Sequence, residues 1–311
     1  MGFDVVALKA AVEAHGRVAR VVIARVEGSS PREVGAALLI WQNGQSGTIG
    51  GGALEYLAAQ QARQSDKDQY SIHALGPDLG QCCGGRIGLW REIYDAERVA
   101  ALPDHVIARP VDGSAMPLPV KRVLTDARAK GCRPDAQLLN GWMIEPVHHP
   151  ETCLWIWGAG HVGRALVQVL APLPDLAITW VDISAERFPA DIPANVTAIP
   201  AGQPSLLATH APLDAHHLVL TFSHTLDLEL CHALLARGFA DCGLIGSATK
   251  WARFRNRLAA LGHAADDIAR IECPIGQPSL GKDPQAIAIG VAAEVLRGKT
   301  HKTLQYKGKT A

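Results

Sequence analysis

The segment from Cys153 to Gly163 limits the fold of this chain more than any other. An apolar run, Cys153-Leu-Trp-Ile-Trp157, is followed at once by Gly158-Ala-Gly160-His-Val-Gly163 and then by apolar residues at helical spacing. Glycines at these places permit a tight turn from strand to helix and the close approach of a phosphate to the helix N-terminus. Asp182 follows the next apolar run, about 20 residues on, where a carboxylate can accept hydrogen bonds from ribose hydroxyls. The pattern predicts a Rossmann-like, doubly wound parallel sheet.

The rest of the C-terminal half continues this pattern. We expect further strands at 176–181, 217–222 and 242–245, and helices at 162–170, 226–237, 249–261 and 286–296. Strands that alternate with helices are typical of a parallel sheet covered on both faces. Nucleotide binding at the glycine turn stays open, because such a turn also serves packing alone and His161 is a bulky neighbour for a pyrophosphate.

The N-terminal half predicts a separate, mixed α/β domain. Its patterns indicate helices at 5–14 and 53–58, and strands at 18–26, 36–41, around 48–49, at 70–75 and at 86–93. Seven of the 19 prolines fall between 102 and 150, which disfavours long helices and central strands there, although 142–147 still reads as a strand that could return to the first sheet. The expected division is a first domain at 1–147 with a Pro-rich stretch at 102–141, a linker at 148–152, a Rossmann-like domain at 153–300 and a basic tail at 301–311.

Composition excludes several classes of function. Thirty basic and thirty acidic residues balance in the 311-residue chain, which argues against a broad surface for nucleic acid or anionic membrane. No stretch approaches the ~20 apolar residues that span a bilayer, and the N-terminus lacks the basic start and apolar core of a signal peptide. The seven cysteines are scattered and odd in number, so we expect reduced thiols and a cytoplasmic location.

Two adjacent cysteines stand among glycines in Leu79-Gly-Gln81-Cys82-Cys83-Gly84-Gly85. Glycine lets the backbone bend sharply and lie against a ligand. Thiolates are soft ligands for soft or heavy metals and can accept or transfer sulfur. The alternative is a pair of small buried hydrophobic residues, since free cysteine is often buried.

Two further turns offer groups for an anion. Gly47-Thr-Ile-Gly50-Gly51-Gly52-Ala-Leu-Glu55 precedes a helix, and three glycines there can present backbone N–H groups to a negative charge. It lacks the Gly-Lys-Ser/Thr ending of a nucleotide P-loop, so ATP hydrolysis is not indicated. Gly28-Ser29-Ser30-Pro-Arg32 adds two hydroxyls and a guanidinium suited to phosphate or carboxylate. Either segment alone could also be a plain surface turn.

Polar residues also follow two strands of the C-terminal half. Ser223 and Asp227 follow one expected strand, and Gly243-Leu-Ile-Gly-Ser-Ala-Thr-Lys250 surrounds the end of another, where open α/β folds bind ligands. We favour helix capping for Ser223 or Asp227. Cys273 has no visible partner thiol and is interpreted as structural.

Taken together and in this order, these motifs resemble the XdhC family of xanthine dehydrogenase accessory proteins and the related CoxI proteins. The match runs from about residue 18 to 297, and the double cysteine is similar to the XdhC branch, whereas the wider family pattern of Cys-Gly-Gly falls here on Cys83. The resemblance implies a non-catalytic chaperone that binds the molybdenum cofactor (molybdopterin), supports its sulfuration with a cysteine desulfurase, and inserts it into the molybdenum subunit of xanthine dehydrogenase. It also implies a homodimer.

The resemblance and the motif chemistry together give a set of candidate cofactor-binding residues, with Cys83 and Cys82 expected at the molybdenum: Ser29, Ser30, Arg32, Gly50, Gly51, Gly52, Glu55, Gln81, Cys82, Cys83, Gly84, Gly158, Gly160, His161, Gly163 and Asp182. A nucleotide in the Rossmann-like pocket is a further candidate ligand. Two alternatives remain: an NAD(P)-dependent oxidoreductase, for which only His161 and His224 could serve in hydride transfer, and a sulfur-transfer enzyme. The latter ranks last, because adjacent cysteines form a strained small-ring disulfide.

Overall fold

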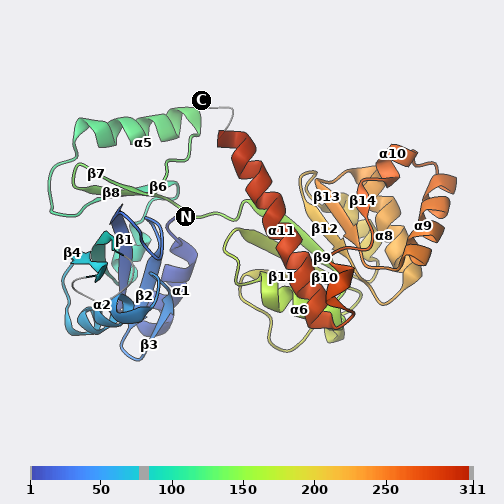
Figure 1. Cartoon of the computed structure of the whole chain (residues 1–311), viewed down its shortest axis with the longest axis horizontal. Coiled ribbons are helices and arrows are strands. Elements are labelled where there is room, and N and C mark those ends of the chain that lie inside the picture. Colours follow the sequence, from blue (N-terminus) through green and yellow to red (C-terminus); the bar gives the residue numbers. More distant parts are fainter. Residues whose placement is uncertain (1, 77–83, 308–311) are drawn as a thin grey trace. The chain divides into compact units, whose positions relative to one another are not determined.

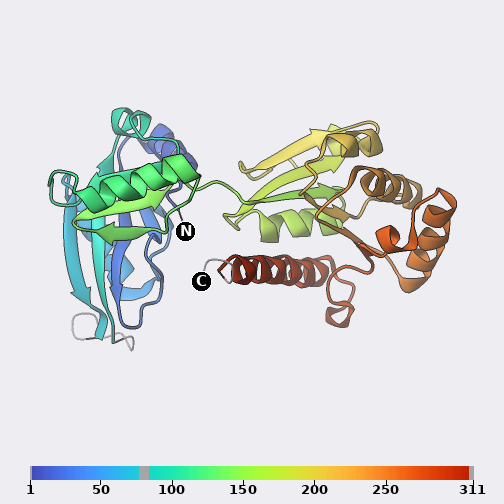
Figure 2. The same ribbon diagram turned by 90° about the horizontal axis from the view of Figure 1, so that it is seen from above.

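The computed structural model describes residues 2–76 and 84–307, and side chains as far as 297. The chain divides into two compact units, 1–149 and 150–311. Each unit contains its own sheet and hydrophobic core (Figures 1 and 2). The prediction of a mixed α/β domain followed by a Rossmann-like domain is confirmed.

The first unit is built on a five-stranded sheet with strand order β3-β2-β1-β5-β4, in which every paired strand is antiparallel. A second sheet of three antiparallel strands has the order β6-β8-β7. The strands of the two sheets are β1 (Val18–Glu27), β2 (Ala37–Trp41), β3 (Gly44–Gly47), β4 (Gln69–Ala74), β5 (Arg86–Tyr94), β6 (Val106–Pro110), β7 (Gln137–Leu139) and β8 (Trp142–Pro146).

Alternating side chains of β1 divide the core of this unit into layers. Val21 and Ile23 pack with α2 (Gly52–Gln64), whereas Val22 and Ala24 pack on the other face with Met143 of the second sheet. The outer face of the second sheet packs against α5 (Leu118–Lys130), as Figure 1 shows. Two more helices, α1 (Val5–His15) and α4 (Ala96–Ala100), pack together near the start of β1 and the end of β5.

Three expectations for this unit are wrong in detail. The third strand is β3, which begins directly after the two-residue turn at 42–43, whereas Thr48 hydrogen-bonds to Glu55 instead of joining the sheet. A 13-residue helix, α5, forms in the Pro-rich stretch, because its prolines lie at its cap and first turn, where no backbone N–H is needed. Finally, β8 does not return to the first sheet but is the central strand of the second.

The second unit is a parallel six-stranded sheet with the order β11-β10-β9-β12-β13-β14. The order reverses between β9 and β12, as in dinucleotide-binding folds. Its strands are β9 (Thr152–Trp157), β10 (Leu176–Asp182), β11 (Val196–Pro200), β12 (His216–Val219), β13 (Asp241–Leu244) and β14 (Ile271–Glu272).

Helices cover both faces of this sheet. The face with Leu154 and Ile156 packs against α6 (His161–Leu170) and α11 (Pro284–Lys307), and the face with Trp155 and Trp157 packs against α8 (His224–Arg237) and α9 (Ala248–Ala260). Two short helices, α7 (Pro204–Leu207) and α10 (Ala265–Ile268), lie in the connections, as do 3-10 turns at Ala185–Arg187, Ala208–His210 and Pro278–Leu280. Because α11 continues to Lys307, part of the expected basic tail is helical.

Candidate functional site

The motif-bearing turns of the first unit lie at one edge of its five-stranded sheet. β1 ends and β2 begins at this edge, so the turn at 28–36 joins them there. Antiparallel pairing brings the end of β3, which leads into 48–51, to the same edge. The start of β5, which follows Gly84 and Gly85, pairs with the end of β1 and also lies there. The sheet therefore collects segments that are up to 58 residues apart in the sequence (28 to 86).

Gly85 packs directly against the turn that follows β1. A Cβ on Gly85 would overlap the carbonyl oxygen of Ser29 and come within 2.8 Å of that of Glu27. The carbonyl of Gly85 accepts a hydrogen bond from the N–H of Leu75 (2.9 Å), which ties the end of β4 to the start of β5. A residue without a side chain is therefore required at position 85.

The thiols expected at the metal, Cys82 and Cys83, lie outside the described residues together with Gln81. Their roles stay predictions. Gly84, the first described residue after them, has no described atom within 4 Å of the place a Cβ would occupy. Unlike Gly85, it is not required to be glycine by any packing in the described part of the chain.

The glycine turn around Gly50 packs against the turn at 28–32, at the end opposite to Gly85. A Cβ on Gly50 would lie 2.6 Å from Cγ and 2.7 Å from Cβ of Pro31. Gly50 also has a φ of +119°, which side-chain-bearing residues rarely adopt. The turn from Gly28 to Arg32 is thus held between Gly85 at one end and Gly50 at the other.

Glu55 engages the N–H groups that the sequence suggested for a ligand. Its carboxylate accepts hydrogen bonds from the Thr48 hydroxyl (2.6 Å) and from the N–H groups of Ile49 (2.9 Å) and Gly51 (3.1 Å). Burial raises the pKa of Glu55, but these hydrogen bonds outweigh it and hold the pKa below its usual value. The carboxylate therefore already serves as the anion at this turn, and it fixes the shape of the turn at the start of α2.

Arg32 is held near the surface of the same edge, with 26% of its side chain exposed. Its guanidinium bonds Glu33 through Nε–Oε2 (3.2 Å) and Nη2–Oε1 (3.3 Å), and this hydrogen bonding lowers the pKa of Glu33. The Ser30 hydroxyl donates to the carbonyl of Arg32 (2.7 Å), so it serves the turn itself. Ser29 contributes its carbonyl to the contact with Gly85.

A cavity of about 560 Å³ lies beside the last residues of β1. It is lined by Arg25 and by Val34 on the side of the motif turn, and by Gln137 and Asn140 on the side of β7. These residues belong to no sequence motif. Only the packing of the second sheet on the first, which places β7 beside β1, brings them together, so no sequence signal could have found them.

In the second unit, the structural surroundings differ among the three glycines of the turn, Gly158, Gly160 and Gly163. Gly158 has a φ of +124° and lies against the carbonyl of Leu220, whose oxygen would be 2.5 Å from a Cβ. A Cβ on Gly163 would overlap the carbonyl oxygen of Gly158, so this residue permits close packing of α6 on β9. Gly160 has a negative φ of −73° and nothing within 4 Å of the place a Cβ would occupy.

Asp182, the expected ribose ligand, is only 3% exposed. Its Oδ2 accepts a hydrogen bond from the N–H of Ala159 (2.5 Å), and its Oδ1 accepts from the N–H of Ile183 (2.7 Å) and from Nε of Arg187 (3.3 Å). The carboxylate therefore stabilises the glycine turn from its buried side. His161, at the start of α6, is exposed and lines a cavity above this turn.

The polar residues after β12 and β13 form a buried ion pair. Ser223 caps α8 by accepting from the N–H of Leu226 (3.4 Å), as predicted. Asp227 is fully buried and pairs with Lys250 (Oδ2–Nζ 2.5 Å), whose ammonium also donates to the carbonyl of Ile245 (2.8 Å). Both charges are satisfied within the protein. Burial raises the pKa of the nearby Cys273 thiol, which agrees with a structural interpretation.

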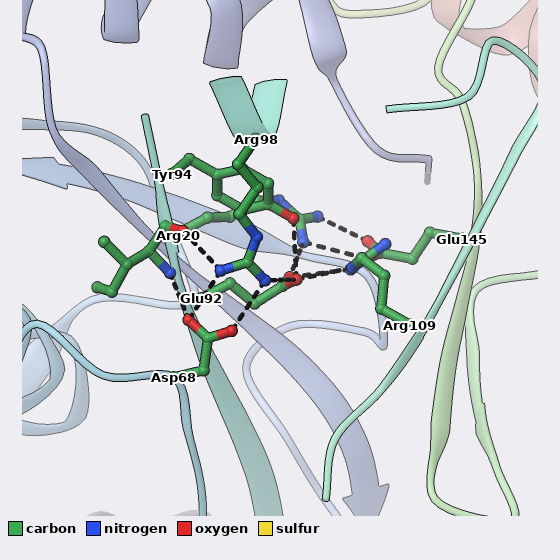
Figure 3. Close-up of polar contacts among 8 residues, drawn as sticks. Arg20, Asp68, Glu92, Tyr94, Arg98, Arg109 and Glu145 are labelled. Atoms are coloured by element: carbon green, nitrogen blue, oxygen red, sulfur yellow. Dashed lines mark hydrogen bonds and ion pairs between the residues drawn. The ribbon is translucent and has the colours of Figure 1, made fainter. Parts of the chain in front are cut away.

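A network of buried charges in the first unit was not foreseen from the sequence (Figure 3). Arg20 of β1 pairs with Glu145 of β8 (Nη2–Oε1 2.6 Å), and Arg109 of β6 bridges Glu145 (2.6 Å) and Glu92 of β5 (2.7 Å). Burial raises the pKa of Glu145, yet the two guanidiniums outweigh it and hold that pKa below its usual value. Two arginines and two glutamates thus balance in charge and join the two sheets. The network is structural.

Within the described residues, no group of three or more His, Cys, Asp and Glu side chains could hold a metal ion. Nor does any helix in that part of the chain combine the length and the apolar character needed to cross a membrane.

Comparison with known proteins gives two family matches. Residues 11–72 match the model of the XdhC and CoxI family, and residues 154–295 match that of the XdhC Rossmann domain. A relative in Escherichia coli K12, the molybdenum cofactor insertion chaperone PaoD, is 24% identical over 294 residues, which cover 90% of this chain and 83% of PaoD. Another, the uncharacterized protein YqeB of the same organism, is 32% identical over 157 residues. That match covers 50% of this chain but only 29% of YqeB.

A solved structure described as a xanthine dehydrogenase from Bacillus halodurans has the same fold. It aligns with a TM-score of 0.68 at 20% sequence identity and covers 95% of both chains. At this identity the similarity concerns the fold alone.

Proposed function

Because this chain belongs to the XdhC and CoxI family, we propose that it is a chaperone for the molybdenum cofactor. It binds the cofactor, supports its sulfuration together with a cysteine desulfurase, and inserts it into the molybdenum subunit of a xanthine dehydrogenase. It acts in the cytoplasm as a homodimer and catalyses no reaction of its own. The similarity to PaoD over most of both chains supports the chaperone role.

The observation that carries this proposal is the convergence of the motif turns at one sheet edge. Gly85 and Gly50 contact the turn at 28–32 from its two ends, so that Arg32 and Gly85, the last residue of the double-cysteine motif, belong to the same edge. A molybdopterin combines a phosphate, a polar pterin and a soft metal centre. Arg32 suits the phosphate, the thiolates of Cys82 and Cys83 suit the metal, and the cavity beside β1 has room for a ring system.

The hydrogen bonds of Glu55 within the glycine turn support an indirect role of this turn in cofactor binding. Since Glu55 takes up the N–H groups of Ile49 and Gly51, Gly50 to Gly52 support the cofactor by shaping the edge around Pro31, and Arg32 supplies the positive charge. Glu55 is a positioning residue for this turn.

The test is anaerobic purification followed by metal analysis and by oxidation of the bound ligand to a fluorescent pterin. We expect molybdenum and pterin in equal amounts. Cys83→Ser is expected to lower the bound molybdenum most and Cys82→Ser less, because Cys83 stands directly before Gly84-Gly85. Cys132→Ser is the matched control, since Cys132 is an exposed thiol of the same unit that follows α5.

Three results would contradict the proposal. The first is a protein that binds neither molybdenum nor pterin when supplied with the cofactor. The second is unchanged binding in both Cys82→Ser and Cys83→Ser, which would make the thiols structural. The third is steady reduction of NAD or NADP by the isolated protein with xanthine or simple alcohols, which would instead favour an oxidoreductase.

A further inference from the structure

The second unit has a cavity at the place where its strand order reverses. It has a volume of about 370 Å³ and lies above the carboxyl ends of β9, β10 and β12, where open parallel sheets bind their ligands. Its walls come from the turn that starts α6, from the 3-10 turn after β10, and from Phe222 after β12. All of these segments belong to one compact unit.

Gly160 leaves the main chain open to this cavity. Neither its backbone conformation nor any neighbouring atom requires glycine at this position, in contrast to Gly158 and Gly163. It caps α6, whose first N–H groups face the turn. A position that is open to the cavity but carries no side chain leaves room for a pyrophosphate against the helix N-terminus.

The side of the cavity nearest β10 is built for a second anion and not for a sugar diol. The usual ribose acceptor, Asp182, is buried beneath the turn, and both its oxygens accept hydrogen bonds from backbone N–H groups. Two guanidiniums, those of Arg164 and Arg187, line the cavity instead, opposed by the single carboxylate of Glu186.

Both arginines are held in position. Arg164 donates from Nε to the carbonyl of Ala159 (3.1 Å) and from Nη2 to the carbonyl of Arg187 (2.8 Å). Arg187 is anchored by Asp182 and lies with its Cζ 4.7 Å from the centre of the Phe222 ring. Phe222 is 60% exposed, which is unusual for a large aromatic side chain and leaves ring surface available for stacking.

We propose that this cavity binds a nucleotide with a phosphomonoester on its ribose, as in NADP or a nucleoside 2′,5′-bisphosphate. Arg164 and Arg187 hold the phosphomonoester, Phe222 stacks against the base, and the open main chain at Gly160 receives the 5′-phosphate groups. A ribose that carries hydroxyls alone brings no negative charge to the two guanidiniums, so NAD binds more weakly. The proposal concerns the second unit and does not depend on how the first unit binds its cofactor.

The experiment is calorimetric titration of the full chain with NADP⁺, NAD⁺, 2′,5′-ADP and 5′-AMP at fixed salt. We expect NADP⁺ and 2′,5′-ADP to bind at least tenfold more tightly than NAD⁺ and 5′-AMP. Arg164→Ala and Arg187→Ala should each weaken NADP⁺ binding about ten- to a hundredfold and change NAD⁺ binding less than threefold. Arg255→Ala, an exposed arginine on α9, is the matched control and should leave all four affinities unchanged.

Thermal melting separates binding from folding, because Arg187 also contacts Asp182. Should Arg187→Ala melt early, Arg164→Ala provides the test alone. Gly160→Ala, which meets no protein atom, should keep the wild-type melting temperature and lose binding of both dinucleotides. Equal affinity for NAD⁺ and NADP⁺, binding of none of the four ligands, or unchanged selectivity in a folded Arg164→Ala variant would each overturn the proposal.

Discussion

The carbonyl oxygen of Ser29 occupies the space that a side chain on Gly85 would need. The turn after β1 and the end of the double-cysteine motif therefore interlock through main-chain atoms. Any change at this contact must move one segment away from the other.

Gly85→Ala is expected to destabilise the first unit by about 1–3 kcal/mol, because the new Cβ displaces the turn at Ser29. Gly84→Ala is the matched control, since no described atom lies near the place of its Cβ, and its melting temperature should equal that of the wild type. Gly84→Ala is nevertheless expected to bind less molybdopterin, because its methyl group would occupy space in which the proposed cofactor approaches the main chain. Equal melting temperatures for the two variants would contradict the interlocking of the turns.

Arg32→Ala should weaken cofactor binding about ten- to a hundredfold, which corresponds to the loss of a charge-assisted hydrogen bond of roughly 1.5–3 kcal/mol. Glu33→Gln should act in the opposite direction and strengthen binding about two- to fivefold, because the carboxylate of Glu33 competes for the same guanidinium. Titration at fixed salt measures both effects, with the exposed Arg122→Ala of α5 as control. An Arg32→Ala variant with wild-type affinity would remove Arg32 from the site.

Glu145→Gln is expected to destabilise the first unit by about 3–5 kcal/mol, since it leaves Arg20 and Arg109 with an excess of buried positive charge. The exposed pair of Asp126 and Lys130 on α5 provides the contrast, and Asp126→Asn should leave the denaturant midpoint unchanged. A Glu145→Gln midpoint as high as that of the wild type would show that the network does not join the two sheets energetically.

His217 should make the second unit less stable in acid. Burial, assisted by the neighbouring His216, lowers the pKa of His217 to about 4. The unfolded chain then binds a proton that the folded chain does not, so the free energy of unfolding falls as the pH drops from about 6.5 towards 4, by roughly 3 kcal/mol in all. Denaturation at pH 7 and pH 4.5 measures this fall.

The matched variants for that measurement are His217→Asn and His210→Asn. Asparagine at 217 can still accept the hydrogen bond that Trp157 Nε1 donates to the imidazole (3.2 Å), but it does not titrate, so this part of the pH dependence should disappear. His210 is exposed, and its replacement should leave the pH dependence intact. An unchanged slope in His217→Asn would show that other groups cause the loss of stability.

Local signals in the sequence were sufficient for most of the second unit. The run from Cys153 to Gly163 predicted β9, the turn and α6, because each step of a parallel βαβ unit depends on neighbours in the chain. The two-residue strand β14 and the half-exposed β11 lack a long apolar run and were missed. Asp182 has the expected place at the end of β10, yet its direction beneath the turn depends on the packing of Ala159 and could not be inferred.

The first unit was predicted less completely because its contacts are distant in sequence. Nothing near Arg20 indicates that it meets Glu145, 125 residues later. The hydrogen bonds that Glu55 accepts from the N–H groups of Ile49 and Gly51 likewise depend on where α2 begins. Because of them, the strand expected around 48–49 is a turn instead. Which motifs share an edge follows from antiparallel register, which composition and spacing do not reveal.

The hydrogen bond from Leu75 to Gly85 also has an evolutionary consequence. β4 and β5 pair through six residues each, and the bond from Leu75 to Gly85 lies next to the last of these pairs. All of these residues lie outside the double cysteine itself. Insertions, deletions or a different sequence between these two residues leave the strand register untouched. Related chains can therefore vary the length and sequence of this segment without any change in the sheet on which it is mounted.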